Sequence, residues 1–231
     1  MQYHWPDSTY IVIPSYKAVN TLRKLIPALL EYVPSCKLCI VDDASMDGTS
    51  QYCNEMNLTY LSHSVNLGKG AALVTGFSWC MKRGAKWIFT VDADGQHAPE
   101  DLHQFIDYVE KHPQTGICIG NREKKAGKMP PARIFSNVLT SKIMSFLCKS
   151  TILDCQCGYR LYSTEMLKKI SITYNRFEME TEVIMKSIKA DFPVAFVNIR
   201  TVYTDGQSHI SHVKDTLRWV KAVLHIRKSI S

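Results

Sequence analysis

Short apolar runs alternate with longer segments of helical pattern up to Gly120, and this alternation constrains the fold more than any other feature of the sequence. The runs are nearly continuous in apolar residues, as in strands that are buried on both faces of a sheet. Each intervening segment is long enough to carry a helix across to a parallel neighbour. We therefore predict an α/β fold with a mainly parallel central sheet covered by helices on both faces. The expected strands are residues 9–14, 37–41, 59–61, 86–91 and 115–120, and the expected helices are residues 20–33, 71–84 and 99–112, with another from about residue 49.

Unusual polar clusters follow three of the expected strands. Ser15 and Tyr16 follow the first strand, Asp42 and Asp43 follow the second, and residues 92–96 follow the fourth. In open α/β sheets, ligands bind at the carboxyl ends of the strands. Because all three clusters fall at that edge, we predict a ligand site there.

The cluster at residues 92–96 is the most specific of the three. Asp92, Asp94 and Gln96 alternate along the chain, so an extended backbone would aim them into one crevice. Two carboxylates held so close repel each other unless a cation lies between them. Hard oxygen ligands favour Mg²⁺ or Mn²⁺, and a phosphorylated substrate would complete the shell of ligands. The alternative is a helix-capping turn, with Asp94 as the cap before Pro99.

The other two acidic and glycine-rich loops are less specific. Asp42 and Asp43 suit either a turn or hydrogen bonds to a base and a ribose. The segment "NLGKGAA" places two glycines before a helix, which suits a phosphate, but it has neither the Walker nor the dinucleotide-binding pattern. We therefore exclude a P-loop kinase and a Rossmann dehydrogenase.

Beyond Gly120 the pattern changes. We expect a basic loop at residues 121–132, an acid-free helix at 132–150, two further helices that include 177–190, a strand at 193–199, and a basic amphipathic helix at 212–231.

The net charge of +7 is concentrated in two segments. Residues 122–153 carry seven Lys/Arg against Glu123 alone, and residues 205–231 carry five against two acids. The cations alternate with apolar residues rather than with stacking aromatics, so we expect no nucleic-acid partner. Trp219 among these cations suggests an interfacial anchor, and we predict peripheral attachment to an anionic membrane. The alternative is that both basic helices pack in the core or form a homodimer. The apolar positions of the last helix are Val213, Leu217, Val220 and Leu224.

Composition adds three expectations. No run of 18 apolar residues is present, so we expect no transmembrane helix. The start of the chain lacks the pattern of a secretory signal, which predicts a cytoplasmic protein on the inner face of the membrane. Without a secretory signal, the eight cysteines are expected to be reduced thiols.

Six motifs occur together in this chain, and in this order they resemble family 2 inverting glycosyltransferases of the GT-A fold. Within that family the resemblance is to the branch of dolichol-phosphate mannosyltransferases and bacterial polyprenyl-phosphate glycosyltransferases. It extends from Tyr10 to about Ser211. The motifs are "VIPSYKAVNTL", "CIVDDASMDGT", "NLGKGAAL", "VDADGQHAPED", "GNRE" and "DCQCGYRLY".

The resemblance implies roles for particular residues. Catalysis would involve Asp94, Asp154 and Arg122, and the metal, Mg²⁺ or Mn²⁺, would be held by Asp92, Asp94 and Gln96. The residues expected to contact the nucleotide sugar or the acceptor are Pro14, Tyr16, Val41, Asp42, Asp43, Lys69, Asp92, Ala93, Arg133, Arg160 and Arg200. For Arg160 and Arg200 the alternative is an ordinary surface arginine. Such enzymes often have acids near the acceptor at the positions of Glu178 and Glu182. The alternative is that these two residues form one solvated helix face.

One departure from the family pattern affects the donor. Members of this branch have Glu shortly after the first Pro-x-Tyr, whereas this chain has Lys17 and Ala18. A contact to the nucleoside is therefore missing, and the resemblance leaves open whether the donor carries UDP or GDP.

The sequence thus predicts a metal-dependent inverting glycosyltransferase that uses a nucleotide sugar and, as acceptor, a polyprenyl phosphate at the membrane surface. A hydroxyl acceptor is the first alternative, with Asp154 as the general base. A non-catalytic protein that binds nucleotide sugars or acts as a membrane adaptor is the second. We expect residues 1–121 to bind the nucleotide sugar, residues 122–211 to bind the acceptor as the second half of the same domain, and residues 212–231 to form the C-terminal helix.

Overall fold

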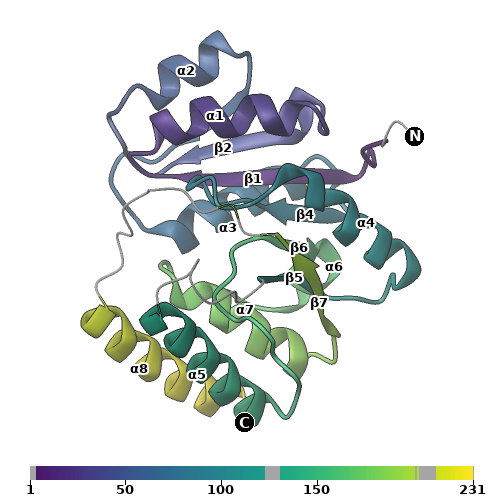
Figure 1. The fold of residues 1–231 in the computed structure, drawn as a ribbon, viewed down its shortest axis with the longest axis vertical. Helices are drawn as coiled ribbons and strands as arrows, with labels where there is room; N and C mark the ends of the chain where they lie inside the picture. The colour runs from purple at the N-terminus through teal and green to yellow at the C-terminus, as the bar shows by residue number, and fades with distance from the viewer. Residues whose placement is uncertain (1–3, 123–130, 201, 203–211, 231) are drawn as a thin grey trace.

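The computed structural model describes residues 4–122, 131–200, 202 and 212–230 (Figure 1). Within these residues seven strands form one sheet in the order β3-β2-β1-β4-β6-β5-β7. All neighbouring strands run parallel except β6, which is antiparallel to β4 and β5. The strands are β1 (Thr9–Ser15), β2 (Leu38–Asp42), β3 (Thr59–Ser62), β4 (Trp87–Thr90), β5 (Ile117–Arg122), β6 (Arg160–Ser163) and β7 (Val194–Ile199).

Helices connect most of these strands. The α-helices are α1 (Val19–Leu30), α2 (Thr49–Glu55), α3 (Lys69–Met81), α4 (Leu102–Lys111), α5 (Pro131–Cys148), α6 (Thr164–Lys169), α7 (Glu178–Lys189) and α8 (His212–Ile230), and two short 3₁₀ helices are η1 (Ser35–Lys37) and η2 (Pro99–Asp101). Every strand and helix expected from the sequence is present within a few residues of its expected bounds, which confirms the α/β class.

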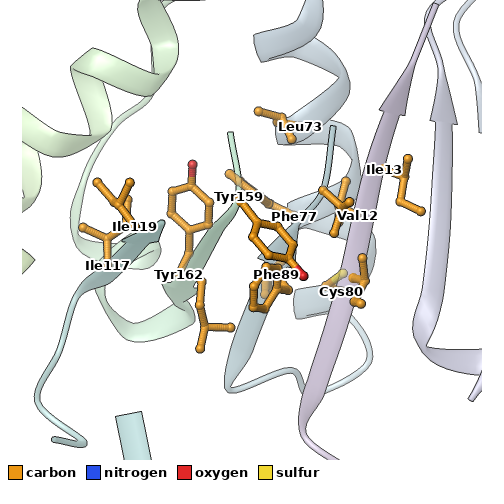
Figure 2. Close-up of a cluster of buried hydrophobic side chains, with 14 of the residues drawn as sticks. Val12, Ile13, Leu73, Phe77, Cys80, Phe89, Ile117, Ile119, Tyr159 and Tyr162 are labelled. Atoms are coloured by element: carbon orange, nitrogen blue, oxygen red, sulfur yellow. The ribbon is translucent and has the colours of Figure 1, made fainter. Parts of the chain in front are cut away.

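Both faces of the sheet are covered, as predicted. Ile11, Val12 and Ile13 are consecutive in β1 and all three are fully buried, although neighbouring side chains in a strand point to opposite faces. Figure 2 shows Val12 and Ile13 on opposite sides of the strand. On the side of Val12, α3 packs so closely that a β-carbon on Gly76 would lie 2.3 Å from Val12 Cγ1. A glycine is therefore required at this contact between helix and strand.

The antiparallel strand β6 was not predicted from the sequence. It inserts between β4 and β5, with Phe89 paired to Leu161 and Cys118 paired to Leu161 on the other edge. The segment that leads into β6 brings Tyr159 against Phe89, with ring centroids 4.8 Å apart (Figure 2). This insertion places residues 154–159 directly beside the carboxyl end of β4, where the predicted ligand site lies.

The expected division of the chain at residues 121 and 122 falls inside β5, and strands from both sides of it belong to the same sheet. At the C-terminal end, α8 packs on α7. None of the helices that the structure describes combines the length and apolar character that crossing a membrane requires.

Candidate active site

Asp92 lies just past the end of β4, next to a partly buried cation. Its Oδ1 is 2.7 Å from Lys69 Nζ at the start of α3, and the same nitrogen lies 3.2 Å from Glu180 Oε1 of α7. Burial by itself would raise the pKa of Asp92, but the charge of Lys69 outweighs it and holds that pKa well below its usual range. Burial likewise lowers the pKa of Lys69, and the two carboxylates more than reverse this, so the Lys69 pKa is raised. Lys69 is thus the cation that offsets the charge of Asp92, a role that the sequence argument had assigned to a metal ion.

Two further contacts fix the Asp92 carboxylate. A β-carbon added to Gly158 would lie 2.2 Å from Asp92 Oδ2, so the backbone of the segment before β6 packs directly on the carboxylate. His97 Nε2 lies 3.9 Å from the same oxygen, and its ring stacks on Tyr159 with centroids 4.6 Å apart. The Tyr159 hydroxyl donates a hydrogen bond to the carbonyl of Ala98. The loop after β4 is therefore anchored to the aromatic core.

Asp94 has a different environment from Asp92. The chain turns at residues 93–95, where Gly95 has a φ of +71°, and Asp94 is exposed. Its Oδ1 accepts a hydrogen bond from the Gln96 backbone N–H at 2.9 Å. The prediction of an extended backbone here is therefore wrong, because a turn separates a partly buried Asp92 from an exposed Asp94; that the side chains of Asp92, Asp94 and Gln96 share one crevice stays a prediction. The helix-capping alternative is also wrong, since η2 is capped at Ala98 without a side-chain hydrogen bond.

A second ion pair lies beside the first. Arg122, the last residue of β5, donates from Nε and Nη2 to the two oxygens of Asp154 at 2.8 and 3.0 Å. Asn137 of α5 donates to Asp154 Oδ1 at 2.6 Å. Burial alone would raise the pKa of the fully buried Asp154, but the charge and hydrogen bonds of Arg122 outweigh it and hold that pKa below its usual range. This carboxylate is a poor general base, because it is buried, its pKa is lowered, and it already accepts hydrogen bonds from four N–H groups, the fourth being the Gln156 backbone N–H at 3.1 Å.

The two acids after β2 hold the loops beside the site. Asp42 accepts hydrogen bonds from the Ser45 backbone N–H at 3.2 Å and from the Tyr60 hydroxyl at 3.1 Å. Asp43 accepts from the N–H groups of Leu67 and Gly68 at 2.8 and 2.7 Å. Both carboxylates are buried. The structure thus gives them the turn-forming role, and a direct contact to the nucleoside stays a prediction.

The remaining positions at the edge between β1 and β2 differ in exposure. Pro14 and Val41 are paired in register, and both are buried, as is Ala93 after β4. Tyr16 is 45% exposed at the mouth of this edge. Of these residues, Tyr16 offers the accessible side chain for a planar ligand.

The three arginines predicted to bind substrate, apart from Arg122, differ in their surroundings. Arg160 is fully buried in β6, and its Nε, Nη1 and Nη2 donate to the carbonyls of Cys157, Glu180 and Cys155. Its donors hold the protein backbone, which argues against a phosphate contact, and the surface alternative is wrong because the side chain is fully buried. Arg200 is exposed, but its Nε and Nη2 both bond Asp101 Oδ1, at 2.9 and 2.8 Å. The side chain of Arg133 lies outside the described residues.

The acids at the start of α7 are buried, so the solvated-face alternative for Glu178 and Glu182 is wrong. Glu182 accepts from the backbone N–H groups of Thr173 and Tyr174 and pairs with Lys186 at 2.7 Å. Glu178 lies 3.5 Å from Arg218 Nε of α8. These acids therefore join α7 to its neighbours, and a place near the acceptor stays a prediction.

Sequence reasoning missed three residues that shape the site: Asn137, Gly158 and Glu180. Each contacts a predicted residue that is distant in the chain, through an arrangement that only the fold creates. Gly158 alone had a signal, because it belongs to the quoted motif "DCQCGYRLY". Among the described residues, no group of three His, Cys, Asp or Glu is arranged to hold a metal ion by itself. None of the eight cysteines forms a disulfide, in agreement with the prediction of reduced thiols.

Most of the chain is similar in sequence to known proteins. The family model described as glycosyl transferase family 2 matches residues 10–171. The polyprenol monophosphomannose synthase of Mycolicibacterium smegmatis is 31% identical over 215 residues, which cover 88% of this chain and 80% of that protein. The UDP-N-acetylglucosamine–dolichyl-phosphate N-acetylglucosaminyltransferase of Methanococcus voltae is 28% identical over 218 residues, covering 85% of this chain and 86% of that protein.

A solved structure shares the arrangement of strands and helices. Glucosyl-3-phosphoglycerate synthase from Mycobacterium tuberculosis, crystallised with Mn²⁺, UDP-glucose and phosphoglyceric acid, superposes with a TM-score of 0.78 at 14% identity. The match covers 98% of this chain and 86% of that one. At this identity the likeness establishes the fold.

Proposed function

The chain belongs to glycosyl transferase family 2 and has the GT-A fold, and on that premise we propose that this enzyme transfers a sugar from a nucleoside diphosphate to a polyprenyl phosphate at a membrane surface. The observation that carries the proposal is the difference in environment between the two acids that follow β4. Asp92 is fixed by Lys69 and Gly158, whereas Asp94 lies exposed one turn away. A rigid acid beside an accessible one suits a site that orients one part of a charged donor and neutralises another.

The residues present fit a divalent metal that binds together with the donor. Asp94 offers a carboxylate and Gln96 an amide oxygen at the exposed turn, and both are hard ligands of the kind that Mg²⁺ and Mn²⁺ prefer. Two protein ligands do not enclose an ion, so the diphosphate would supply the others. The bound metal would act as a Lewis acid that offsets charge on the departing diphosphate. Asp92, already paired with Lys69, would orient the donor rather than ligate the metal.

The state of Asp154 favours a phosphate acceptor over a hydroxyl acceptor. A sugar hydroxyl needs a general base, and Asp154 is fully buried with a lowered pKa and four hydrogen-bond donors around it. A lipid phosphate is already ionised near neutral pH and needs no base. The two relatives named above, whose names specify polyprenol and dolichyl phosphate, point the same way.

The chemical step then follows in one displacement. An oxygen of the acceptor phosphate attacks the anomeric carbon and forms the new C–O bond, while the bond from that carbon to the diphosphate breaks and its electron pair leaves with the nucleoside diphosphate. Attack opposite the leaving group inverts the anomeric centre. Asp154 engages two donors of Arg122 and so fixes the plane of a guanidinium at the end of β5, the edge of the sheet where the phosphates would gather.

Transfer assays test the proposal. Purified protein with Mg²⁺ or Mn²⁺ is incubated with a panel of UDP- and GDP-sugars and a short-chain polyprenyl phosphate, and the glycosyl phospholipid is measured by mass spectrometry. We expect transfer from at least one donor, and loss of transfer in Asp94→Ala but not in Asp107→Ala, an exposed acid on α4. Transfer only to a glycan hydroxyl would refute the phosphate acceptor. Donor binding without transfer or hydrolysis would favour the non-catalytic alternative.

A further inference from the structure

Helix α5 has two faces of opposite character. The residues that face the protein include Asn137, which bonds Asp154, and the buried Ser141 and Met144. At about 100° per residue, the exposed apolar residues cluster within an arc of about 80° on the opposite face. Phe135 is 69% exposed and Phe146 80% exposed, although both are large aromatics. The exposed apolar residues of α5 are Phe135, Leu139, Ile143 and Phe146.

Helix α8 repeats this arrangement with three of the apolar residues expected from its sequence, but without Trp219. Trp219 is turned toward the protein, where its Nε1 donates to Thr181 Oγ1 of α7 at 3.0 Å. The prediction that Trp219 is an interfacial anchor is therefore wrong. On the outer side of α8, Leu217 and Leu224 are each 59% exposed and Val220 lies between them. The residues that pack inward with Trp219 are Ala222, Val223 and Ile226.

Cations flank both apolar stripes. Lys142 on α5, and Lys221, Arg227 and Lys228 on α8, are exposed, and at about 100° per residue they project within or beside the apolar arcs. The sequence has no acidic residue anywhere in α5 or from Leu217 to Ile230 in α8. Figure 1 draws both helices at the same end of the long axis, away from α1 and α2.

We propose that the exposed stripes of α5 and α8 dock the enzyme on an anionic lipid bilayer. The inference rests on the proposed function only for its purpose, which is to bring the site to a lipid acceptor. An apolar stripe edged by Lys and Arg matches the boundary between acyl chains and anionic headgroups. A second copy of the chain fits less well, because a two-fold contact between identical patches would bring these cations against one another.

Docking through α5 would also set the distance from the membrane to the chemistry. One face of the helix would touch lipid, and the other face holds Asp154 through Asn137. The Arg122–Asp154 pair would then lie about one helix diameter, roughly 10–12 Å, from the bilayer boundary. A phosphate at headgroup level would need only a short rise to reach it.

Vesicle flotation tests the docking surface in the full chain. We expect binding to vesicles of 70% phosphatidylcholine and 30% phosphatidylglycerol at low salt, with much weaker binding to pure phosphatidylcholine. The double variant Phe135→Ser/Phe146→Ser should bind these vesicles at least about tenfold more weakly than the wild type. Lys221→Glu/Lys228→Glu should lose at least about fivefold per lysine. Met46→Ser, which removes a fully exposed apolar side chain elsewhere, is the matched control and should bind like the wild type.

Activity assays separate this proposal from the proposed function. With a short-chain polyprenyl phosphate in solution, Phe135→Ser/Phe146→Ser should match the wild type, while with a long-chain acceptor in vesicles its transfer should fall with its binding. Equal vesicle binding by the wild type and both double variants would overturn the proposal. A wild-type dimer in light scattering that these substitutions dissociate, without vesicle binding, would assign the surface to a second copy instead. Absence of transfer with every acceptor would refute the proposed function and leave the flotation result valid.

Discussion

Replacing Lys69 with methionine removes one charge from the centre of the site and little volume. Lys69 Nζ lies 2.7 Å from Asp92 Oδ1 and 3.2 Å from Glu180 Oε1, so the two carboxylate oxygens lie within about 6 Å of each other. Without the ammonium group, the buried Glu180 and the partly buried Asp92 would face each other across an apolar side chain. We expect Lys69→Met to be less stable than the wild type.

The structure bounds the size of this effect. Removing one partner of a buried ion pair costs about 3–5 kcal/mol, because the other charge is left without compensation. Glu180 keeps Arg160 Nε at 3.7 Å, and Asp92 keeps a neighbouring His97 ring at 3.9 Å. These neighbours place the expected loss of unfolding free energy near the lower end, at about 3 kcal/mol. For a chain of this length that loss corresponds to a fall in Tm of about 6–12 °C.

Urea unfolding followed by circular dichroism measures the loss. The matched control is Lys82→Met, an exposed lysine just after the same helix, which we expect to change the unfolding free energy by less than about 0.5 kcal/mol. In the double variant Lys69→Met/Asp92→Asn the second charge is also removed, and about 1–3 kcal/mol of the loss should be recovered. If Lys69→Met cost no more than Lys82→Met, Lys69 would not be the counterion of Asp92. A purely additive double variant would refute the coupling in the same way.

Three other predictions concern the neighbours of this pair. Gly158→Ala should lower transfer activity by about 100-fold, because the added β-carbon displaces the Asp92 carboxylate. Steady-state kinetics at saturating donor measure this loss, and a kcat equal to that of the wild type would contradict the prediction. In Asp94→Asn, Mn²⁺ binding in the presence of UDP or GDP, followed by electron paramagnetic resonance, should weaken by at least about tenfold, and Asp92→Asn should lose much less. Because the pKa of Asp154 is lowered in the folded state, this carboxylate stabilises the wild type above about pH 4, and that stabilisation is lost as the pH falls through the folded-state pKa. In Arg122→Gln the buried Asp154 lacks its cation and its pKa rises, so the stability deficit of this variant in urea should be largest at pH 7 and shrink toward pH 4; a deficit independent of pH would contradict this.

The sequence predicted the sheet and the edge at which the polar clusters gather, since both depend on local pattern. The strands are apolar runs that would be buried in any compact fold, and polar residues follow them where a parallel sheet brings strand ends together. The antiparallel β6 was missed because "RLYS" is short and its burial depends on neighbours from β4 and β5. Pairing between segments that are distant in the chain leaves little trace in a short run of residues.

The roles of individual side chains were harder to predict. Asp92 and Asp94 are two residues apart and resemble each other in sequence, yet the turn at Gly95 leaves Asp92 partly buried and Asp94 exposed. Arg160 resembled a phosphate ligand or a surface residue, and it is instead buried with its donors on backbone carbonyls. A long cationic side chain can be compensated wherever the fold supplies acceptors, and those acceptors come from other parts of the chain.

By itself, the sequence determined the fold class, the sheet edge at which the polar clusters gather, and the family to which the chain belongs, because strand burial, helix period and ordered motifs are local properties. Only the tertiary structure decided which cation faces which carboxylate, and which sides of α5 and α8 stay in solvent. Lys69 and Asp92 are 23 positions apart, and Glu180 is far from both, so their 2.7 and 3.2 Å contacts arise only from packing α3 and α7 against the end of β4. Trp219 is a second example. Its position in the sequence lies among cations, but in the folded protein its indole points toward α7 and donates a hydrogen bond to Thr181. Electrostatic compensation and burial are set by neighbours in space, and those neighbours exist only after the chain has folded.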